Sequence, residues 1–399
     1  MPWSLPEGVC FVLDRLETCG FRADIVGGCV RDRMRGVEAH DYDITTDATP
    51  EQMQAVFHDM RTIETGIRHG TLTVLYKNEP YEITTYRTEG TYTDHRHPDG
   101  VSFSRQLSDD LCRRDFTVNA MCYHPVRGVT DLYGGQDDLR RRLLRCVGDP
   151  ERRLEEDALR ILRALRFSSV LDFSIEEATA RAIHEKKQLL HAVSAERIYI
   201  ELKKLLMGVR VTDVLMQYRD VLDEIVPTLR DLPLSLSALP MLPTVELRFC
   251  ALFAAAPDAE ERFLAACDRL RTDRALRRTG EQLLPLVKSP TGDRRDLLRC
   301  LFSLGEEGTE QLLLLRYALG TDAHDRREEL RALQMQAPVY RLCDLAVDGK
   351  TLTEGGLRGK AVGEMLTRLL YAVMDGKVEN EREALLRYCE QIREETYGI

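Results

Sequence analysis

The sequence predicts an α+β head with a small mixed sheet, followed by an all-α remainder. Short runs rich in β-branched and aromatic residues lie at 62–64, 72–76 and 82–86, and turn residues separate them. Such runs are typical of strands joined in hairpins. From Ser174 onward almost no stretch is typical of a strand, so the sheet is expected to be confined to the head.

Length and composition limit the class of protein. A chain of 399 residues favours two or three domains. The composition, 43% hydrophobic and 31% charged, is that of a soluble globular protein. The N-terminal segment MPWSLPEGVC lacks the basic and apolar parts of a signal peptide, and no run of about 18 apolar residues is present. We therefore expect a cytoplasmic protein with no membrane span.

The cysteines and the net charge narrow the class further. Eleven cysteines are scattered without a C-x-x-C pair, and an odd number cannot all pair within the chain. They are expected to be reduced thiols, not zinc ligands or a disulfide framework. The formal net charge of −10 argues mildly against nucleic-acid binding, but local basic clusters decide that question.

Two helices are expected beside the first strands. Pro6 to Cys19 carries apolar residues at helical spacing and is followed by Gly20. Thr49 to Phe57 begins with an N-cap threonine, and Pro50 takes the first helical position. The turn KNEP joins the last two strand-like runs of the head.

The stretch IVGGCVRDRMRGVEAHDYDITT, residues 25–46, carries the most specific chemical signal. Asp41 and Asp43 are expected on its second strand, where residues two apart project from the same face. Two neighbouring carboxylates repel each other unless a cation lies between them. Hard oxygen ligands of this kind suit Mg²⁺, which takes further ligands from substrate phosphates. The alternative is a solvated strand end.

The glycines of the same stretch suggest a phosphate site. Gly27 and Gly28 form an expected turn before a short helix that carries Arg31. Glycine lets the backbone approach a phosphate closely, and the start of a helix offers free N–H groups to it. The stretch as a whole therefore predicts a site for a nucleoside triphosphate and its metal, although an isolated Gly-Gly pair is most often a plain turn.

The order GGxVRD, then Gly36, then D-x-D resembles the first motif of class II CCA-adding tRNA nucleotidyltransferases and bacterial poly(A) polymerases. The resemblance implies that Asp41 and Asp43 are catalytic and hold Mg²⁺. It also implies that Gly28 and Arg31 bind the triphosphate. Glu82, in YEITTYR, would be a third catalytic carboxylate, and its alternative is a solvated strand glutamate.

A second motif, RRDFTVNA at residues 113–120, matches the same family. The resemblance implies that Arg114, Asp115 and Asn119 bind the nucleotide. We expect this segment to be helical, which would put Asp115 and Asn119 on one face, four residues apart, with ribose hydroxyls in reach. The following DLYGGQDDLRRRLLR resembles a third motif, interpreted as a hinge.

A fourth motif, EDALRILRALRF, lies in the expected helix Arg152 to Phe167. Helical spacing puts its leucines on one buried arc and its charged residues on the opposite arc. The family resemblance assigns base recognition to Asp157 and Arg160, because one acceptor and one donor fit cytosine and adenine but not uracil or guanine. Arg163 and Arg166 would face the triphosphate or the RNA. An ordinary charged helix face is the alternative.

The segment Thr88 to Ser104 is polar and is expected to be a mobile loop. In the family, a flexible loop here helps the enzyme to change from adding C to adding A. His95 and His97 lie within it, but no third ligand is spaced to complete a metal site.

The resemblance implies a polymerase-β-like nucleotidyltransferase head over residues 1–148. A helical neck (149–210), a helical body (211–290) and a tRNA-binding helical tail (291–399) would follow. The activity it implies is template-independent addition of C, C and A to the 3′ end of tRNA, from CTP and ATP. Two alternatives stay open: an A-adding or poly(A) polymerase, and a non-catalytic RNA-binding module. The oligomeric state is not predictable from the sequence.

Overall fold

A computed structural model describes residues 3–90 and 100–397. The chain forms two compact units, one of Met1–Arg230 with Arg269–Arg271 and one of Asp231–Asp268 with Thr272–Ile399. The boundary at Arg230 falls inside the proline-rich segment 227–243. The finer division into head, neck, body and tail stays a prediction.

A mixed seven-stranded sheet forms the centre of the head, in the order β3-β4-β5-β2-β1-β8-β9. Strands β2 and β5 run parallel, and the other neighbours in this sheet are antiparallel. The small mixed sheet expected from the sequence is confirmed. Its strands are β1 (Ala23–Val26), β2 (Asp43–Thr46), β3 (Thr62–Ile63), β4 (Thr71–Tyr76), β5 (Glu79–Thr85), β8 (Met121–His124) and β9 (Gly128–Asp131).

Short helices cover the sheet. Helix α1 packs against β5, where Gly8 lies so close to the Tyr81 ring that a Cβ would meet it at 2.4 Å. Helix α3 starts as expected, because Thr49 and Gln52 form a capping box. The turn between β4 and β5 places Lys77 and Asn78 at positive φ, as a tight hairpin requires. The head helices are α1 (Glu7–Thr18), α2 (Gly28–Met34), α3 (Pro50–Val56), α4 (Leu107–Cys112) and α5 (Gly135–Arg140).

The expected helix over the second motif is wrong. Helix α4 ends at Cys112, and only Thr117–Asn119 forms a single 3₁₀ turn (η2). The segment between them is extended at Phe116, which bridges to Cys146. This bridge pulls the backbone out of the helical path, so Asp115 lies outside any helix.

The expected helix from Arg152 to Phe167 is two helices, α6 (Pro150–Glu156) and α7 (Leu159–Leu171). Asp157 interrupts it with extended backbone angles, φ −137° and ψ 103°. Its carboxylate accepts a hydrogen bond from the Leu159 N–H at 3.1 Å, which satisfies an unpaired donor at the start of α7. The break therefore follows from the capping preference of aspartate.

The neck region is helical except for one short strand, β11 (Ser174–Ile175), which pairs with β10 (Leu143–Leu144) of the head. Ser169 on α7 donates a hydrogen bond to the Leu205 carbonyl of α9, and its own carbonyl accepts from Arg210. These bonds fix α7 against α9. The remaining helices of this unit are α8 (Glu177–Lys186), α9 (Ala195–Leu206), α10 (Val211–Gln217) and α11 (Arg219–Ile225).

The segment predicted to be a mobile loop begins and ends in a short antiparallel pair, β6 (Arg87–Glu89) with β7 (Val101–Phe103). The residues between 91 and 99, with His95 and His97, lie outside the described part of the chain. The loop prediction therefore stays a prediction.

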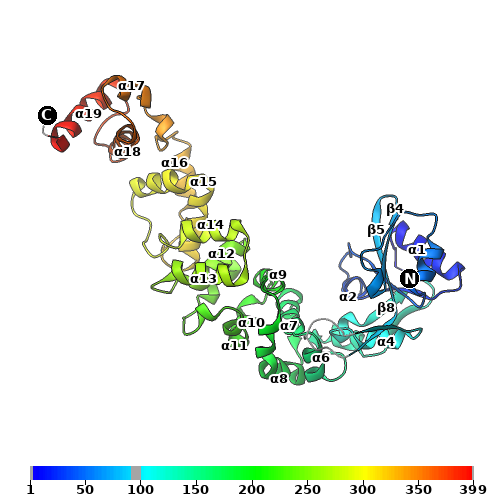
Figure 1. The fold of residues 1–399 in the computed structure, drawn as a ribbon. Helices are drawn as coiled ribbons and strands as arrows, with labels where there is room; N and C mark the ends of the chain where they lie inside the picture. Colours follow the sequence, from blue (N-terminus) through cyan, green and yellow to red (C-terminus); the bar gives the residue numbers. More distant parts are fainter. Residues whose placement is uncertain (1–2, 91–99, 398–399) are drawn as a thin grey trace. The chain divides into compact units, whose positions relative to one another are not determined.

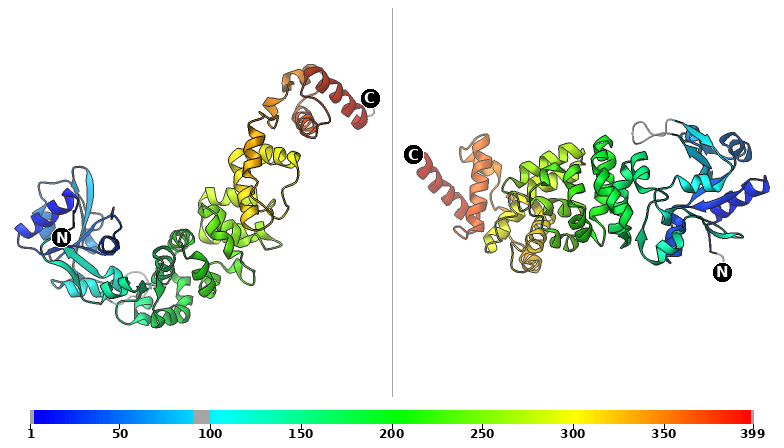
Figure 2. Two further views of the ribbon diagram at one scale, coloured as in Figure 1. Left: turned by 180° about the vertical axis from the view of Figure 1, so that it is seen from behind. Right: turned by 90° about the horizontal axis from the view of Figure 1, so that it is seen from below.

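In the described residues of the second unit, the regular secondary structure is all helical, as Figures 1 and 2 show. Its C-terminal half packs around leucines of α15, α16, α18 and α19, among them Leu313, Leu330 and Leu369. The helices are α12 (Val245–Phe253), α13 (Ala259–Leu270, whose last turn falls in the first unit), α14 (Arg274–Leu283), α15 (Arg294–Ala318), α16 (Arg327–Gln334), α17 (Gly349–Glu354), α18 (Lys360–Met374) and α19 (Arg382–Tyr397).

The structure bears on two predictions made from the composition, the state of the cysteines and the absence of a membrane span. All eleven cysteines are free thiols, as expected. In the described residues, no helix combines the length and the apolar character that a membrane crossing needs.

Gly208→Ala tests the close contact that fixes α7. A Cβ at residue 208 would lie 2.5 Å from the Ser169 carbonyl carbon, so the backbone of α7 would have to move. We expect a loss of about 1–3 kcal/mol in the free energy of unfolding, measured by urea denaturation. Gly100→Ala is the control, because a Cβ there meets no atom within 4 Å. Equal stability of the two variants would contradict the packing argument.

Candidate active site

The predicted carboxylates lie at the start of β2 and on β5. Asp43 is the first residue of β2, and Ile44 pairs with Ile83 of the parallel strand β5. This register puts Glu82 beside Asp43 on the same face of the sheet. All three predicted acidic side chains, Asp41, Asp43 and Glu82, reach solvent.

Asp41 precedes the strand on which it was expected. Strand β1 offers partners only up to Val26, which faces Asp43, because Gly27 turns the chain at φ +85°. No further residue of β1 is left to pair with Asp41. The alternation of exposed Asp41, buried Tyr42 and exposed Asp43 nevertheless keeps both carboxylates on one side.

Negative charge accumulates at this edge of the sheet. Partial burial and the charges of Asp41 and Glu82 raise the pKa of Asp43, and Arg114 acts in the opposite direction. Carboxylates that disfavour one another's ionisation are a fitting environment for a hard cation. Within the described residues, no three His, Cys, Asp or Glu side chains form a complete metal site.

Arg114 lies between these carboxylates and the glycine turn. Its Nη1 is 3.0 Å from the point that a Cβ on Gly27 would occupy, so a larger residue there would press on the guanidinium. Its Nη2 donates a hydrogen bond to Asp110 at 3.1 Å. The left-handed backbone of Gly27 and the absence of its side chain both serve this contact. The structure thus gives Gly27 the conformational role that the sequence suggested for the glycine pair.

A chain of buried hydrogen bonds joins α2, the second motif and α7. Arg31 donates to the Asn119 side-chain oxygen at 2.7 Å, and the Asn119 amide donates to Asp115 at 3.0 Å. The other oxygen of Asp115 accepts from Arg163 Nε and Nη2, at 2.8 and 2.5 Å. These bonds, with one from the Phe116 N–H, occupy most of the acceptor capacity of Asp115. The side chains predicted to meet ribose are therefore held by protein groups in this structure.

Asp157 and Arg160, the pair that was expected to read the base, bind different protein groups in this structure. Asp157 pairs with Arg197 of α9 at 3.2 Å. Arg160 is buried and donates to Glu156 and to the Arg153 carbonyl, both at 2.9 Å, and to the Arg113 carbonyl at 2.8 Å. The alternative interpretation, an ordinary charged helix face in contact with solvent, therefore does not hold for Arg160.

Arg163 and Arg166, which were expected to face the triphosphate or the RNA, both have protein partners in this structure, and their contact with substrate stays a prediction. Arg163 turns inward to Asp115, and Arg166 pairs with Glu201 of α9 at 2.7 Å. Both guanidinium groups lie over the ring of Phe167, at 5.4 and 3.9 Å from its centre, and Arg31 approaches it to 5.1 Å. Helix α7 is buried on nearly all sides, so its charges are matched inside the protein.

Three family models match successive parts of the chain. The model of the Poly A polymerase head domain matches residues 23–145. A model described as "Probable RNA and SrmB- binding site of polymerase A" matches residues 172–232. The model of tRNA nucleotidyltransferase domain 2 matches residues 242–389.

Full-length relatives decide the family. The CCA-adding enzyme of Lactobacillus helveticus is 36% identical over 390 residues, which cover 96% of each chain. The CCA-adding enzyme of Limosilactobacillus reuteri is also 36% identical, over 392 residues. The chain belongs to the CCA-adding enzyme family. It is thus a CCA tRNA nucleotidyltransferase, which adds C, C and A to the 3′ end of tRNA.

Solved structures of CCA-adding enzymes share the fold. The Bacillus stearothermophilus enzyme, solved in complex with CTP, is 32% identical and superimposes with a TM-score of 0.80 over 98% of both chains. The Thermotoga maritima enzyme, solved with tRNA, is 19% identical with a TM-score of 0.69, over 97% of this chain and 96% of that one. The polymerase-β-like head followed by helices is confirmed for this member of the family.

The sequence of this CCA-adding enzyme did not reveal which side chains hold the motif residues in place. Asp110, Arg197, Glu201 and Phe167 lie beside predicted residues and hold them in place. One signal was available, because Asp110 stands four residues before Arg114, a spacing typical of ion pairs on a helix. The contacts of Arg197 and Glu201 depend on how α9 packs against α7, which local spacing does not predict.

The buried carboxylate of Asp115 should make this enzyme's stability depend on acid pH. Burial opposes ionisation of Asp115, but the charge of Arg163 and hydrogen bonds from Asn119 and Arg163 lower its pKa to about 2. Because the folded-state pKa is depressed, the stabilisation is present above the unfolded-state pKa of about 4 and is lost as the pH falls toward 2. The full effect is about 2 kcal/mol.

Asp115→Asn should therefore weaken the protein at neutral pH and flatten its loss of stability below about pH 5. The measurement is urea denaturation at several pH values, followed by a signal from the first unit. Asp172→Asn is the control, since that carboxylate is about half exposed and pairs with exposed Arg142. Parallel stability curves for the wild type and Asp115→Asn would contradict the role of this group.

Proposed function

We propose that the enzyme adds nucleotides at the face of the sheet that carries Asp41, Asp43 and Glu82. The 3′-hydroxyl of tRNA attacks the α-phosphorus of CTP or ATP, and pyrophosphate leaves. The observation that carries the proposal is the pairing of β2 with β5, which sets Asp43 beside Glu82 next to the Arg114 guanidinium. Its B. stearothermophilus relative was solved with CTP, which supports this substrate class.

Enzymes of this family generally use a divalent metal. We propose Mg²⁺, held by Asp41 and Asp43, because carboxylate oxygens are hard ligands and both side chains are exposed on one side of the chain. When bound, such ions activate the attacking oxygen and stabilise the leaving one. Glu82 contributes charge beside Asp43 and acts as the third carboxylate of the site.

Arg114, with the turn at Gly27 and Gly28, is proposed to receive the triphosphate. Arg114 stands beside the carboxylates, and the glycine turn offers backbone without side chains next to it. Arg31 is buried and contacts Asp32 and Asn119, so it supports the glycine turn from inside the protein. Asp115 and Asn119 then position Arg31 and Arg163, and their direct contact with ribose stays a prediction.

Base selection is proposed to depend on Asp157 and Arg160. An ionised carboxylate accepts only and a guanidinium donates only, so the two together match the amino group and ring nitrogen of cytosine or adenine. Three of the five N–H groups of Arg160 serve protein acceptors, which fixes the direction of the others. An unmatched buried polar group costs about 1–3 kcal/mol, so two mismatches would exclude uracil and guanine.

The helical parts after the head are proposed to hold the tRNA, with the tail over residues 291–399 as one contact region. A cytoplasmic location stays a prediction. CCA addition is the activity that the full-length relatives carry in their names, and neither the A-adding nor the poly(A) alternative is needed. Incorporation of CTP and ATP on tRNA lacking C, CC or A tests the activity directly.

Asp43→Asn should abolish nucleotide addition and leave tRNA binding nearly unchanged, because the carboxylate serves the chemistry. We expect a loss of at least about 10³-fold in kcat, equivalent to about 4 kcal/mol. Single-turnover incorporation gives the rate, and filter binding gives the tRNA affinity. Asp59→Asn is the matched control, because this aspartate pairs with Arg15 at the surface. Retention of more than a few per cent of activity in Asp43→Asn would contradict the catalytic role of Asp43.

Asp157→Ala and Arg160→Ala should change nucleotide choice. Asp157→Ala removes the acceptor, so selection against UTP and GTP should weaken by about tenfold or more. Arg160→Ala should lower kcat/KM for both CTP and ATP. Arg181→Ala on α8 is the control, since its exposed side chain pairs along its own helix with Glu177. If kcat/KM ratios for the four nucleotides stay constant in both variants, base reading lies elsewhere.

A further inference from the structure

Asp110 is a fully buried carboxylate on the inner side of α4. Its helix packs on the sheet through Leu107 and Leu111, which form a cluster with Val26 and Tyr86. Asp110 itself has no exposed surface, although it belongs to none of the motifs recognised in the sequence. A charged group in this position must be matched by protein donors.

Four hydrogen bonds from three residues surround the carboxylate. One oxygen accepts from Thr45 Oγ1 at 3.2 Å and from Arg114 Nη2 at 3.1 Å. The other accepts from Arg113 Nε and Nη2, at 3.1 and 2.6 Å. Burial opposes ionisation, but the charges of Arg114 and Arg113 lower the pKa of Asp110. The group is therefore an anion at neutral pH.

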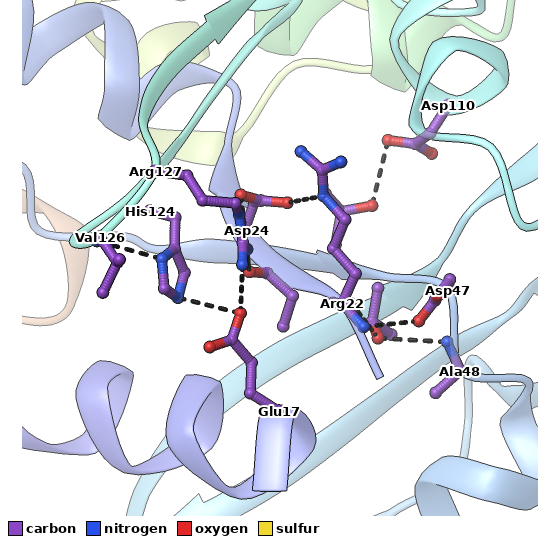
Figure 3. Close-up of polar contacts among 12 residues, drawn as sticks. Glu17, Arg22, Asp24, Asp47, Ala48, Asp110, His124, Val126 and Arg127 are labelled. Carbon is purple, nitrogen blue, oxygen red and sulfur yellow. Dashed lines mark hydrogen bonds and ion pairs between the residues drawn. The ribbon is translucent and has the colours of Figure 1, made fainter. Parts of the chain in front are cut away.

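The bond from Thr45 ties Asp110 to the catalytic strand. Thr45 lies two residues after Asp43 on β2, so both side chains project from the same face of the sheet. A second buried carboxylate, Asp24, pairs with Thr45 across β1 and β2. Figure 3 shows Asp24 between Arg22 and Arg127, each at 3.0 Å, while Asp110 approaches from α4. The two acids thus have separate cationic partners.

The bond from Arg114 fixes the cation beside the acidic edge. Arg114 lies against the Gly27 turn, and the residue before that turn, Val26, faces Asp43 across β1 and β2. An arginine side chain has many rotamers, and a buried ionised partner selects one of them. Asp110 therefore decides where the Arg114 guanidinium stands before any substrate arrives.

The bonds from Arg113 extend the connection to the neck. The Arg113 carbonyl accepts the hydrogen bond from Arg160 Nη2 at 2.8 Å. Asp110 therefore holds the side chain of Arg113, and the backbone carbonyl of Arg113 orients Arg160. Within one compact unit, a single carboxylate thus contacts the catalytic strand, the proposed triphosphate ligand and the residue that supports the proposed base reader.

We propose that Asp110 is a positioning residue for nucleotide addition, acting through Arg114 on the triphosphate and through Arg113 on Arg160. This inference rests on the proposed function. A carboxylate with a purely structural role would stabilise the fold and leave the kinetic constants of folded enzyme unchanged. The two roles therefore differ in the kinetics.

The test is Asp110→Asn, which keeps the size of the side chain and removes its charge. We expect KM for both CTP and ATP to rise about tenfold or more, which corresponds to about 1.4 kcal/mol, with a smaller change in kcat. Rates are normalised to the folded fraction from circular dichroism. Asp109→Asn is the control on the same helix, because Asp109 is only half-buried and accepts from Ser104. Constants within twofold of wild type for Asp110→Asn would overturn the proposal.

A double-mutant cycle tests the route of the effect. In an Arg114→Ala background, Asp110→Asn should raise KM clearly less than it does in the wild-type background, because one of its two intermediaries is already absent and only the route through Arg113 is left. Full additivity would overturn positioning through Arg114. If Asp110→Asn does not fold, Thr45→Val replaces it, since that change removes one of the four donors at constant shape, and unchanged KM values would then overturn the proposal.

Failure of the proposed function is distinguishable from failure of this inference. A wild-type enzyme that adds no nucleotide to tRNA would refute the former. A wild-type enzyme that adds nucleotides, with an equally efficient Asp110→Asn variant, refutes only the latter. Equilibrium dialysis with CTP measures triphosphate binding in both proteins without the addition step, and a weaker affinity in the variant supports the role of Asp110.

Discussion

The ion pair between buried Asp115 and partly exposed Arg163 is the interaction on which the architecture of the first unit depends. It connects the head segment after α4 to helix α7, and both side chains also support Arg31, through Asn119 and around Phe167. Removing Arg163 would leave the buried Asp115 carboxylate without its main cationic partner, at a cost of about 2 kcal/mol. The motif residues of head and neck are therefore one electrostatic unit.

This arrangement changes what the motifs mean physically. Many of their charged residues contact other motif residues or buried partners, and few are left to meet a substrate directly. Arg166 with Glu201, Asp157 with Arg197 and Asp110 with Arg114 follow the same pattern. These ion pairs keep the groups beside Asp41, Asp43 and Glu82 in one geometry. A fixed geometry favours catalysis, because little reorganisation is needed when substrate binds.

The sequence predicted the elements well where local chemistry determines them. Thr49 and Pro50 start α3, and the turn at Lys77 and Asn78 joins β4 to β5. Asp41 and Asp43 lie on the same side of the chain, as predicted. Strand β2 nevertheless begins only at Asp43, because the neighbouring strand β1 ends at Val26 and offers no partner to Asp41. Two helices were misjudged, at Phe116 and at Asp157, because a bridge and a capping bond interrupt patterns that look continuous. The orientation of Arg163 and Arg166 depends on α9 and on the second motif, which spacing along α7 cannot reveal.

The burial of these charges has a consequence for ionic strength. Salt screens exposed charges over about 8–10 Å but reaches buried pairs much less. The contacts of Asp110, Asp115 and Glu201 are shielded from solvent, so the cohesion of the catalytic unit should vary little with salt. Binding to an RNA backbone, in contrast, releases counterions and weakens steeply as salt rises. In this enzyme, the slope of activity against salt concentration therefore reports mainly on the RNA-contacting surface.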